Sequence, residues 1–84
     1  MSSRHLRTLA AVFEDPVRAN ILWSDIESMF VYLGARLNEG SGSRVRVTLN
    51  KRRAVYHRPH PQKETPLRTI RSLRKFLTKA GVKP

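Results

Sequence analysis

Two of the three histidines in this sequence lie in a basic segment, His57-Arg58-Pro59-His60. Imidazole exchanges a proton near neutral pH, so histidine can act as a general base or a general acid. Cleavage of RNA without a metal needs a base for the 2′-hydroxyl, an acid for the leaving oxygen, and cations around the phosphate. His57 and His60 are therefore the candidate catalytic residues. The alternative is that both are surface side chains around a proline turn that stack on bases, and His5 is expected to be an exposed helical residue.

A metal-dependent site is not expected from the residue types present. The chain has no cysteine, and the spacing His57-x-x-His60 lacks a third ligand nearby. Asp25 and Glu27 are two positions apart on a predicted helix, so their carboxylates point to different faces. The sequence therefore predicts neither a metal nor another cofactor.

The net charge of +11 is concentrated in the C-terminal part of the chain. Residues 35–84 contain fourteen Lys and Arg against two carboxylates, whereas residues 1–34 contain three against four. Cations placed near phosphates release condensed counterions, so such a basic half favours nucleic acid as the partner. Attraction to an acidic protein and a simple solvated surface are the alternatives.

Most of these cations fall on a predicted β-hairpin and on one ridge of the predicted last helix. Side chains of this kind position RNA through its phosphates and do not read its sequence. The residues predicted to bind RNA are Arg44, Arg46, Lys51, Arg52, Arg53, Arg58, Lys63, Arg68, Arg71, Arg74, Lys75 and Lys79.

The hairpin is predicted over residues 44–57 because apolar and polar residues alternate there. Asn50-Lys51 suits a two-residue turn, since Asn tolerates a positive φ. That register places His57 opposite Arg44 on the open face of the sheet and turns Tyr56 into the core, where Trp23 is also expected. A three-residue turn would instead place His57 on the core side.

The first 22 residues are predicted to form a helical extension that precedes the main domain, residues 23–84. A helix over residues 3–14 is expected to bury one apolar stripe. The stripe consists of Leu6, Leu9, Ala10 and Phe13.

Two further helices are predicted from capping patterns. The second helix begins at Ser24, which forms a capping box with Glu27, and it ends before Gly34. The last helix begins with Thr65 as its cap and Pro66 at its first position. Its buried residues are expected to be Ile70, Leu73, Leu77 and Ala80, with Phe76 on the flank.

These elements define the fold class. A short strand near residues 35–39 would complete a three-stranded antiparallel sheet with the hairpin. The expected fold is α+β, with the order α-β-β-β-α of the double-stranded-RNA-binding domain (dsRBD), both helices on one face of the sheet, and one extra N-terminal helix.

From Trp23 to Gly81 the sequence resembles the HicA family of toxin–antitoxin toxins. The helix that begins near Trp23 and ends at Leu33-Gly34 matches this family, and so does the Gly-Ser turn at residues 40–43. The hairpin, the segment Pro59-His60-Pro61, Lys63-Glu64 and the helix from Leu67 to Ala80-Gly81 also match.

The resemblance implies a dsRBD-like fold, mRNA cleavage without a metal, and neutralisation by a HicB antitoxin. It also implies a catalytic histidine after a Gly-Ser pair, as Gly-Ser-His. Here Gly40-Ser41 is followed by Gly42, and Gly42-Ser43 by Arg44, so the usual base is absent. Neither replacement takes up a proton near neutral pH.

Three functions follow from these patterns. The first is the toxin of a type II toxin–antitoxin system, a metal-independent mRNA endoribonuclease that a HicB-like antitoxin neutralises. Such a toxin would contact DNA only indirectly, through the antitoxin. The second is a non-catalytic RNA-binding module of the dsRBD-like fold, and the third is a domain that recognises an acidic protein. A cytoplasmic location without membrane attachment is expected, because no apolar run approaches 18 residues.

Overall fold

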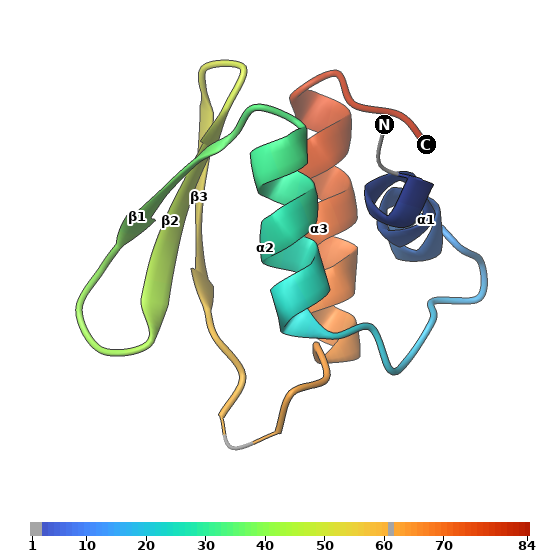
Figure 1. Ribbon diagram of the computed structural model, residues 1–84, viewed down its shortest axis with the longest axis horizontal. Helices are drawn as coiled ribbons and strands as arrows, with labels where there is room; N and C mark the ends of the chain where they lie inside the picture. The colour runs from blue at the N-terminus through green and yellow to red at the C-terminus, as the bar shows by residue number, and fades with distance from the viewer. Residues whose placement is uncertain (1–2, 61) are drawn as a thin grey trace.

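A computed structural model describes residues 3–60 and 62–84 of the chain. Its elements are α1 (Ser3–Val12), α2 (Trp23–Tyr32), β1 (Arg36–Glu39), β2 (Arg44–Leu49), β3 (Arg52–His57) and α3 (Leu67–Lys79). The strands form one antiparallel sheet in the order β1-β2-β3. Helices α2 and α3 cover one face of this sheet, and α1 lies on the far side of the two helices (Figure 1). The predicted α+β class and the dsRBD-like order α-β-β-β-α are confirmed.

The β2–β3 hairpin has the predicted two-residue turn and register. Arg44 pairs with His57, and Val45 pairs with Tyr56. Asn50 and Lys51 adopt φ values of 49° and 69°, the left-handed pair that a type I′ turn requires. Asn50 has a second role, because its side-chain amide donates a 2.7 Å hydrogen bond to the carbonyl of Ala80 at the end of α3. The turn is thereby fixed to the helix layer.

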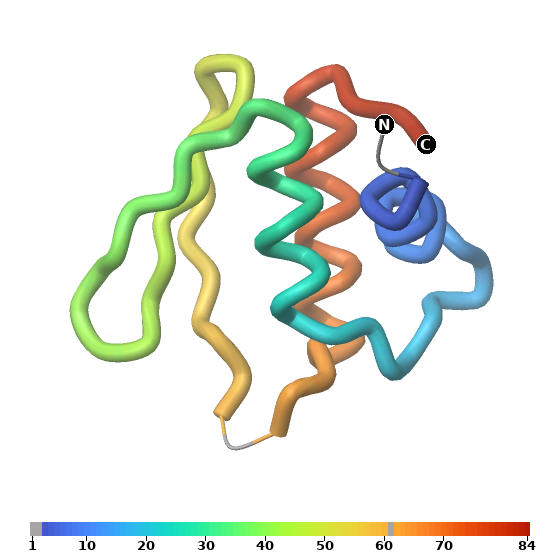
Figure 2. The backbone as a smooth tube through the Cα atoms, in the orientation of Figure 1, coloured from blue at the N-terminus to red at the C-terminus, as the bar shows by residue number. Residues whose placement is uncertain are grey.

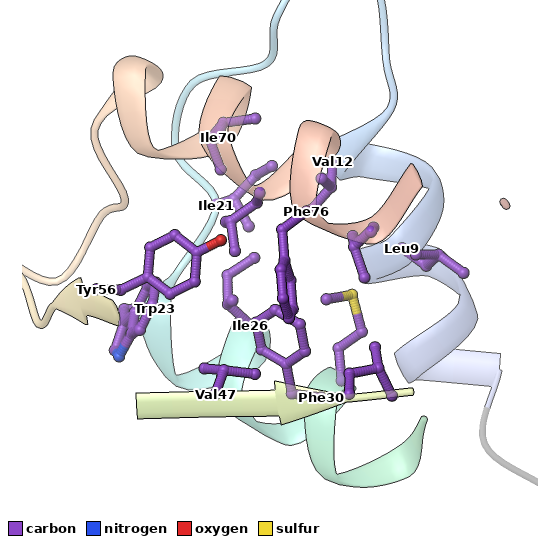
Figure 3. Packing of buried hydrophobic residues seen from close by; sticks show 14 of the residues in the cluster. Leu9, Val12, Ile21, Trp23, Ile26, Phe30, Val47, Tyr56, Ile70 and Phe76 are labelled. Carbon is purple, nitrogen blue, oxygen red and sulfur yellow. The ribbon is translucent and has the colours of Figure 1, made fainter. Parts of the chain in front are cut away.

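The core lies between the sheet and the helix pair. Ile26, Met29 and Phe30 of α2 are fully buried. The rings of Phe30 and Phe76 pack edge to face with centroids 5.9 Å apart (Figure 3). The predicted α3 stripe of Ile70, Leu73, Leu77 and Ala80 is also buried, together with Trp23 and Tyr56.

The predicted starts of α2 and α3 are wrong by one or two residues. Helix α2 begins at Trp23 after the N-cap residue Leu22, so Ser24 does not cap it. Helix α3 begins at Leu67 after the N-cap Pro66, and neither cap uses a side chain. The physical reason is a short antiparallel bridge between Leu22 and Glu64. In it the amide of Trp23 donates to the Lys63 carbonyl at 3.0 Å, which replaces a capping serine.

The buried face of α1 also differs from the predicted stripe. Leu9 is buried, but Leu6 is 47% exposed. The residues buried on this helix are Thr8, Leu9, Ala11 and Val12. The helix ends at Val12, before Phe13. The side chain of Arg74 on α3 donates hydrogen bonds to the Val12 carbonyl at the end of the helix and to the Glu14 carbonyl just beyond it. This contact, which local spacing cannot reveal, sets the rotation of α1. After α1 the chain runs down the side of the molecule that faces away from the sheet and then crosses to the lower end of α2 (Figure 2).

Candidate nucleic-acid interface

A groove of about 550 Å³ lies where β3 ends and α3 begins. The segment 57–60 forms one wall, and the first turns of α3 form the other. The residues that line it are Val55, Tyr56, His57, Arg58, Pro59, His60, Gln62, Pro66, Arg68, Thr69 and Ser72. The structure thus brings both candidate catalytic histidines to one groove, together with Arg68 of the basic helix.

His57 lies on the open face of the sheet, at the end of edge strand β3. The Arg58 amide donates to the Ser43 carbonyl at 2.9 Å, so the neighbouring pair Arg44–His57 has the closer, non-hydrogen-bonded spacing. Both side chains are exposed. An exposed imidazole therefore has a guanidinium as its cross-strand neighbour at the mouth of the groove.

The other two histidines differ in their surroundings. His60 is exposed and lines the same groove as His57. His5 is half-buried rather than exposed, and its ring lies 5.0 Å from that of Tyr32 at the end of α2. His5 is thus part of the contact between α1 and α2 and does not line the groove.

Arg58 joins the groove wall to the rest of the fold. Its guanidinium donates to the Glu27 carboxylate of α2 at 2.7 Å and to the Glu39 carboxylate of β1 at 2.7 and 2.8 Å. The indole N–H of Trp23 also donates to Glu27. The hydrogen bonds from Arg58 lower the pKa of Glu39, against a smaller opposing effect of burial. Glu39 and Glu27 in turn raise the pKa of Arg58, so its guanidinium stays charged at neutral pH.

Tyr56 lies in the floor of the groove. Burial raises the pKa of its hydroxyl to about 12, with the neighbouring Ser72 hydroxyl acting in the opposite direction. Tyr56 is therefore neutral at physiological pH, and its hydroxyl oxygen is buried, so it does not supply a second base.

Two cationic surfaces flank the groove. We call the exposed α3 row of Arg68, Arg71, Lys75 and Lys79 the helix ridge. We call the β-sheet surface that faces away from the helices the open face; its positions are Arg36, Asn38, Arg44, Arg46, Thr48, Arg53, Val55 and His57. Lys51, Arg52 and Lys63 are exposed as well. Among the cations predicted to bind RNA, Arg58 and Arg74 are not exposed in this way. Both are half-buried, and both form hydrogen bonds to groups within the chain.

A match to a family model decides the family. The model described as the HicA toxin of bacterial toxin–antitoxin matches residues 23–82, from the first residue of α2 to just beyond α3. The chain belongs to the HicA toxin family. It is thus a toxin-type component of a toxin–antitoxin system. No curated protein and no solved structure matched the chain.

The HicA match begins at Trp23, so α1 lies outside the matched range. The division into an extension, residues 1–22, and a HicA-like domain, residues 23–84, stays a prediction. In the structure Leu9 and Val12 of α1 belong to the same hydrophobic cluster as the helices of the HicA-like part.

The departure from Gly-Ser-His can now be placed in the structure. Arg44 is the first residue of β2, and it takes the position after Gly42-Ser43. Its cross-strand neighbour is His57. In this HicA chain His57 therefore lies across from Arg44, one of the two positions where the resemblance implies the base; the other is Gly42.

Sequence reasoning missed the carboxylates Glu27 and Glu39. The sequence places Glu27 in a capping box and predicts no partner for Glu39, yet both bind Arg58. A signal was present in the composition, because Glu39 is one of only two carboxylates in a strongly basic half. The partners are 31 and 19 residues apart in the chain, so no local pattern pairs them.

Across residues 3–60 and 62–84, no cluster of three side chains has the types and positions to hold a metal ion. Within the same residues, no helix has the length and apolar character to cross a bilayer.

Proposed function

We propose that this chain is the toxin of a type II HicAB-like pair and that it cleaves mRNA without a metal in the His57–His60 groove. The observation that supports this most is the placement of two histidines and Arg68 in one groove. Arg44 adds a second cation beside His57. General acid–base groups and phosphate-binding cations are the two requirements of metal-free RNA cleavage.

The reaction is an internal transesterification followed by release of the leaving strand. One histidine removes the proton of the 2′-hydroxyl, and the 2′-oxygen forms a bond to the adjacent phosphorus. The bond from phosphorus to the 5′-oxygen breaks, and that oxygen takes a proton from the other histidine, leaving a 2′,3′-cyclic phosphate. We assign the base to His57, because Arg44 beside it can stabilise the charge that develops on the phosphate.

The proposed partners follow from the family and from the charge. The RNA would be held by the helix ridge and the hairpin cations, which contact phosphates rather than base edges. A HicB-like antitoxin with an acidic surface would cover the same cations, and contact with DNA would occur only through that antitoxin. We propose that the chain acts in the cytoplasm, where mRNA is its substrate.

The second candidate is a non-catalytic RNA-binding module. It is favoured by the residues that follow the two Gly-Ser pairs, Gly42 and Arg44, because the family resemblance implies a histidine after such a pair. Such a module would use the same cationic surfaces and the dsRBD-like fold, with His57 and His60 as surface side chains that contact bases.

The test is RNA cleavage in EDTA by the parent protein and by His57→Ala and His60→Ala. Cleavage by the parent is expected to fall about 100-fold in His57→Ala, because the general base is lost, while RNA affinity is retained. His5→Ala, whose histidine packs on Tyr32, is the matched control and should cleave as the parent does. RNA binding without cleavage by the parent would favour the second candidate instead.

A further inference from the structure

The open face of the sheet has an unusual composition for a solvated surface. Its four arginines, Arg36, Arg44, Arg46 and Arg53, are all exposed. None of its eight positions is a carboxylate, and none of these arginines forms an ion pair within the described residues. Solvated surfaces usually intersperse charges of both signs. The open face is therefore a second concentration of positive charge, separate from the helix ridge.

The register spreads these cations over the whole face. Arg36 and Arg53 flank Thr48 in one cross-strand row, and Arg46 lies between Asn38 and Val55 in the next. Val55 is 56% exposed, which gives the face an apolar spot beside Arg46. Arginine planes and apolar side chains accept unstacked bases, and guanidinium groups bind phosphates. This mixture suits a nucleic acid strand better than it suits a small anion.

The open face reaches the groove through His57. This residue is the last position of the open face on β3, and it also lines the groove with Arg68, the first cation of the helix ridge. The groove is therefore continuous with both cationic surfaces. A strand that passes through it meets the ridge at one end and the open face at the other.

The two cationic surfaces do not lie in one plane. Helix α3, which carries the ridge, packs on the core face of the sheet, whereas the open face points away from both helices (Figure 1). A dsRBD-type module binds a duplex along one surface, reading the shape of a stiff A-form helix. A stiff duplex cannot follow a path that turns around the end of edge strand β3. A single strand can, because its bases unstack and its backbone rotates.

We propose that the open face is a second RNA-binding surface, which holds single-stranded RNA on one side of the groove while the helix ridge holds it on the other. This inference rests on the proposed function, since it assumes that RNA occupies the groove. It names the substrate as a flexible single strand in spite of the dsRBD-like fold.

The test measures binding of 2′-O-methyl RNA, which lacks the attacking hydroxyl and so cannot be cleaved during the measurement. The probes are a 6-nucleotide single strand, an 18-nucleotide single strand and an 18-base-pair duplex. The sheet variant is Arg46→Gln with Arg53→Gln, and the ridge variant is Arg71→Gln with Lys79→Gln. Arg7→Gln with Lys83→Gln removes the same charge from exposed positions outside both surfaces.

For the 18-nucleotide strand, the plot of log affinity against log salt should become shallower in each of the two surface variants. Its slope should shrink in magnitude by about 1.4, because each variant loses two phosphate contacts and each contact contributes about 0.7. The Arg7/Lys83 variant should change it little. The duplex should lose affinity in at most one of the two surface variants, and the 6-nucleotide strand should respond less than the long strand in both.

If the sheet variant binds the 18-nucleotide strand as the parent does, the inference of a second RNA-binding surface is overturned. The proposed function is not, because RNA binding by the parent protein would still stand. Equal losses for duplex and single strand in both surface variants would also overturn it. Absence of RNA binding by the parent would overturn the proposed function together with this inference.

Discussion

Replacing Leu9 by alanine is expected to destabilise the fold by about 3 kcal/mol, within the range measured for deletion of a buried leucine side chain. Leu9 is 4% exposed, and it belongs to the hydrophobic cluster shared with α2 and α3. The deleted atoms would leave a cavity that α1 can close only by moving. Arg74 resists that movement, because its side chain donates to the Val12 carbonyl at the end of α1 and to the Glu14 carbonyl just beyond it. A domain of this size has little stability to lose, so the unfolded fraction should become detectable.

Leu6→Ala is the matched control for this prediction. It makes the same substitution on the same helix, but Leu6 is 47% exposed, so its loss should cost less than about 0.5 kcal/mol. Urea unfolding followed by circular dichroism measures both variants, and the midpoint of Leu9→Ala should fall by well over 1 M relative to Leu6→Ala. Similar midpoints would mean that α1 is not fixed to the helix layer as the structure has it.

The result also decides how far the HicA-like domain extends. The family match begins at Trp23, and the sequence divides the chain at residue 22. A large effect of Leu9→Ala would make α1 a structural part of the same core. A negligible effect would leave residues 1–22 as the separable extension that the sequence predicts.

The parts of the fold that the sequence predicts well are those set by local chemistry. The alternation around Val45 and Val47 and the turn residues Asn50-Lys51 determine which face of the hairpin is buried, and the register follows from them. Gly34 and Gly81 mark the ends of α2 and α3, where they adopt φ values of 90° and 82°. At these positions an L side chain would be strained, so glycine is an informative signal.

The parts that it predicts poorly depend on contacts between distant residues. The starts of α2 and α3 follow from the bridge between Leu22 and Glu64, which no capping pattern encodes. The rotation of α1 follows from Arg74, which the periodicity of α3 places on an exposed cationic surface. An arginine looks the same in the sequence whether it binds solvent, a phosphate or two backbone carbonyls.

The same distinction applies to the candidate site. The hairpin register alone places His57 beside Arg44, and the structure agrees. That His60 and Arg68 share a groove with His57 depends on where residues 58–60 and 62–66 lie between the sheet and α3, and no local pattern in the sequence shows this. The sequence does not predict the ion pairs of Arg58, since its carboxylate partners lie on α2 and β1.

Arg58→Met is expected to destabilise the fold by about 2 kcal/mol at pH 7, because the Glu27 carboxylate loses its charged hydrogen-bond partner. Methionine keeps most of the apolar stem, so the change reports mainly on charge. The figure lies below that of a fully buried pair because the Arg58 and Glu27 side chains are 30% and 25% exposed. The segment that carries His57 and His60 would also lose its link to α2 and β1, so RNA cleavage should fall even where the variant is folded.

The ion pair between Arg58 and Glu39 makes part of the loss in Arg58→Met depend on pH, and this part separates charge from packing. Arg58 lowers the pKa of Glu39 below its ordinary value of 4.5, so the stabilisation is present above that value and is lost as the pH falls through the folded-state pKa. The difference in unfolding free energy between parent and Arg58→Met should thus be largest near neutral pH and shrink below about pH 4.5. Arg71→Met, which removes an exposed arginine of the helix ridge, should show a small difference at every pH. A loss in Arg58→Met that stays constant from pH 7 to pH 3 would assign the role of Arg58 to packing of its stem and would contradict the ionic link between the groove and the fold.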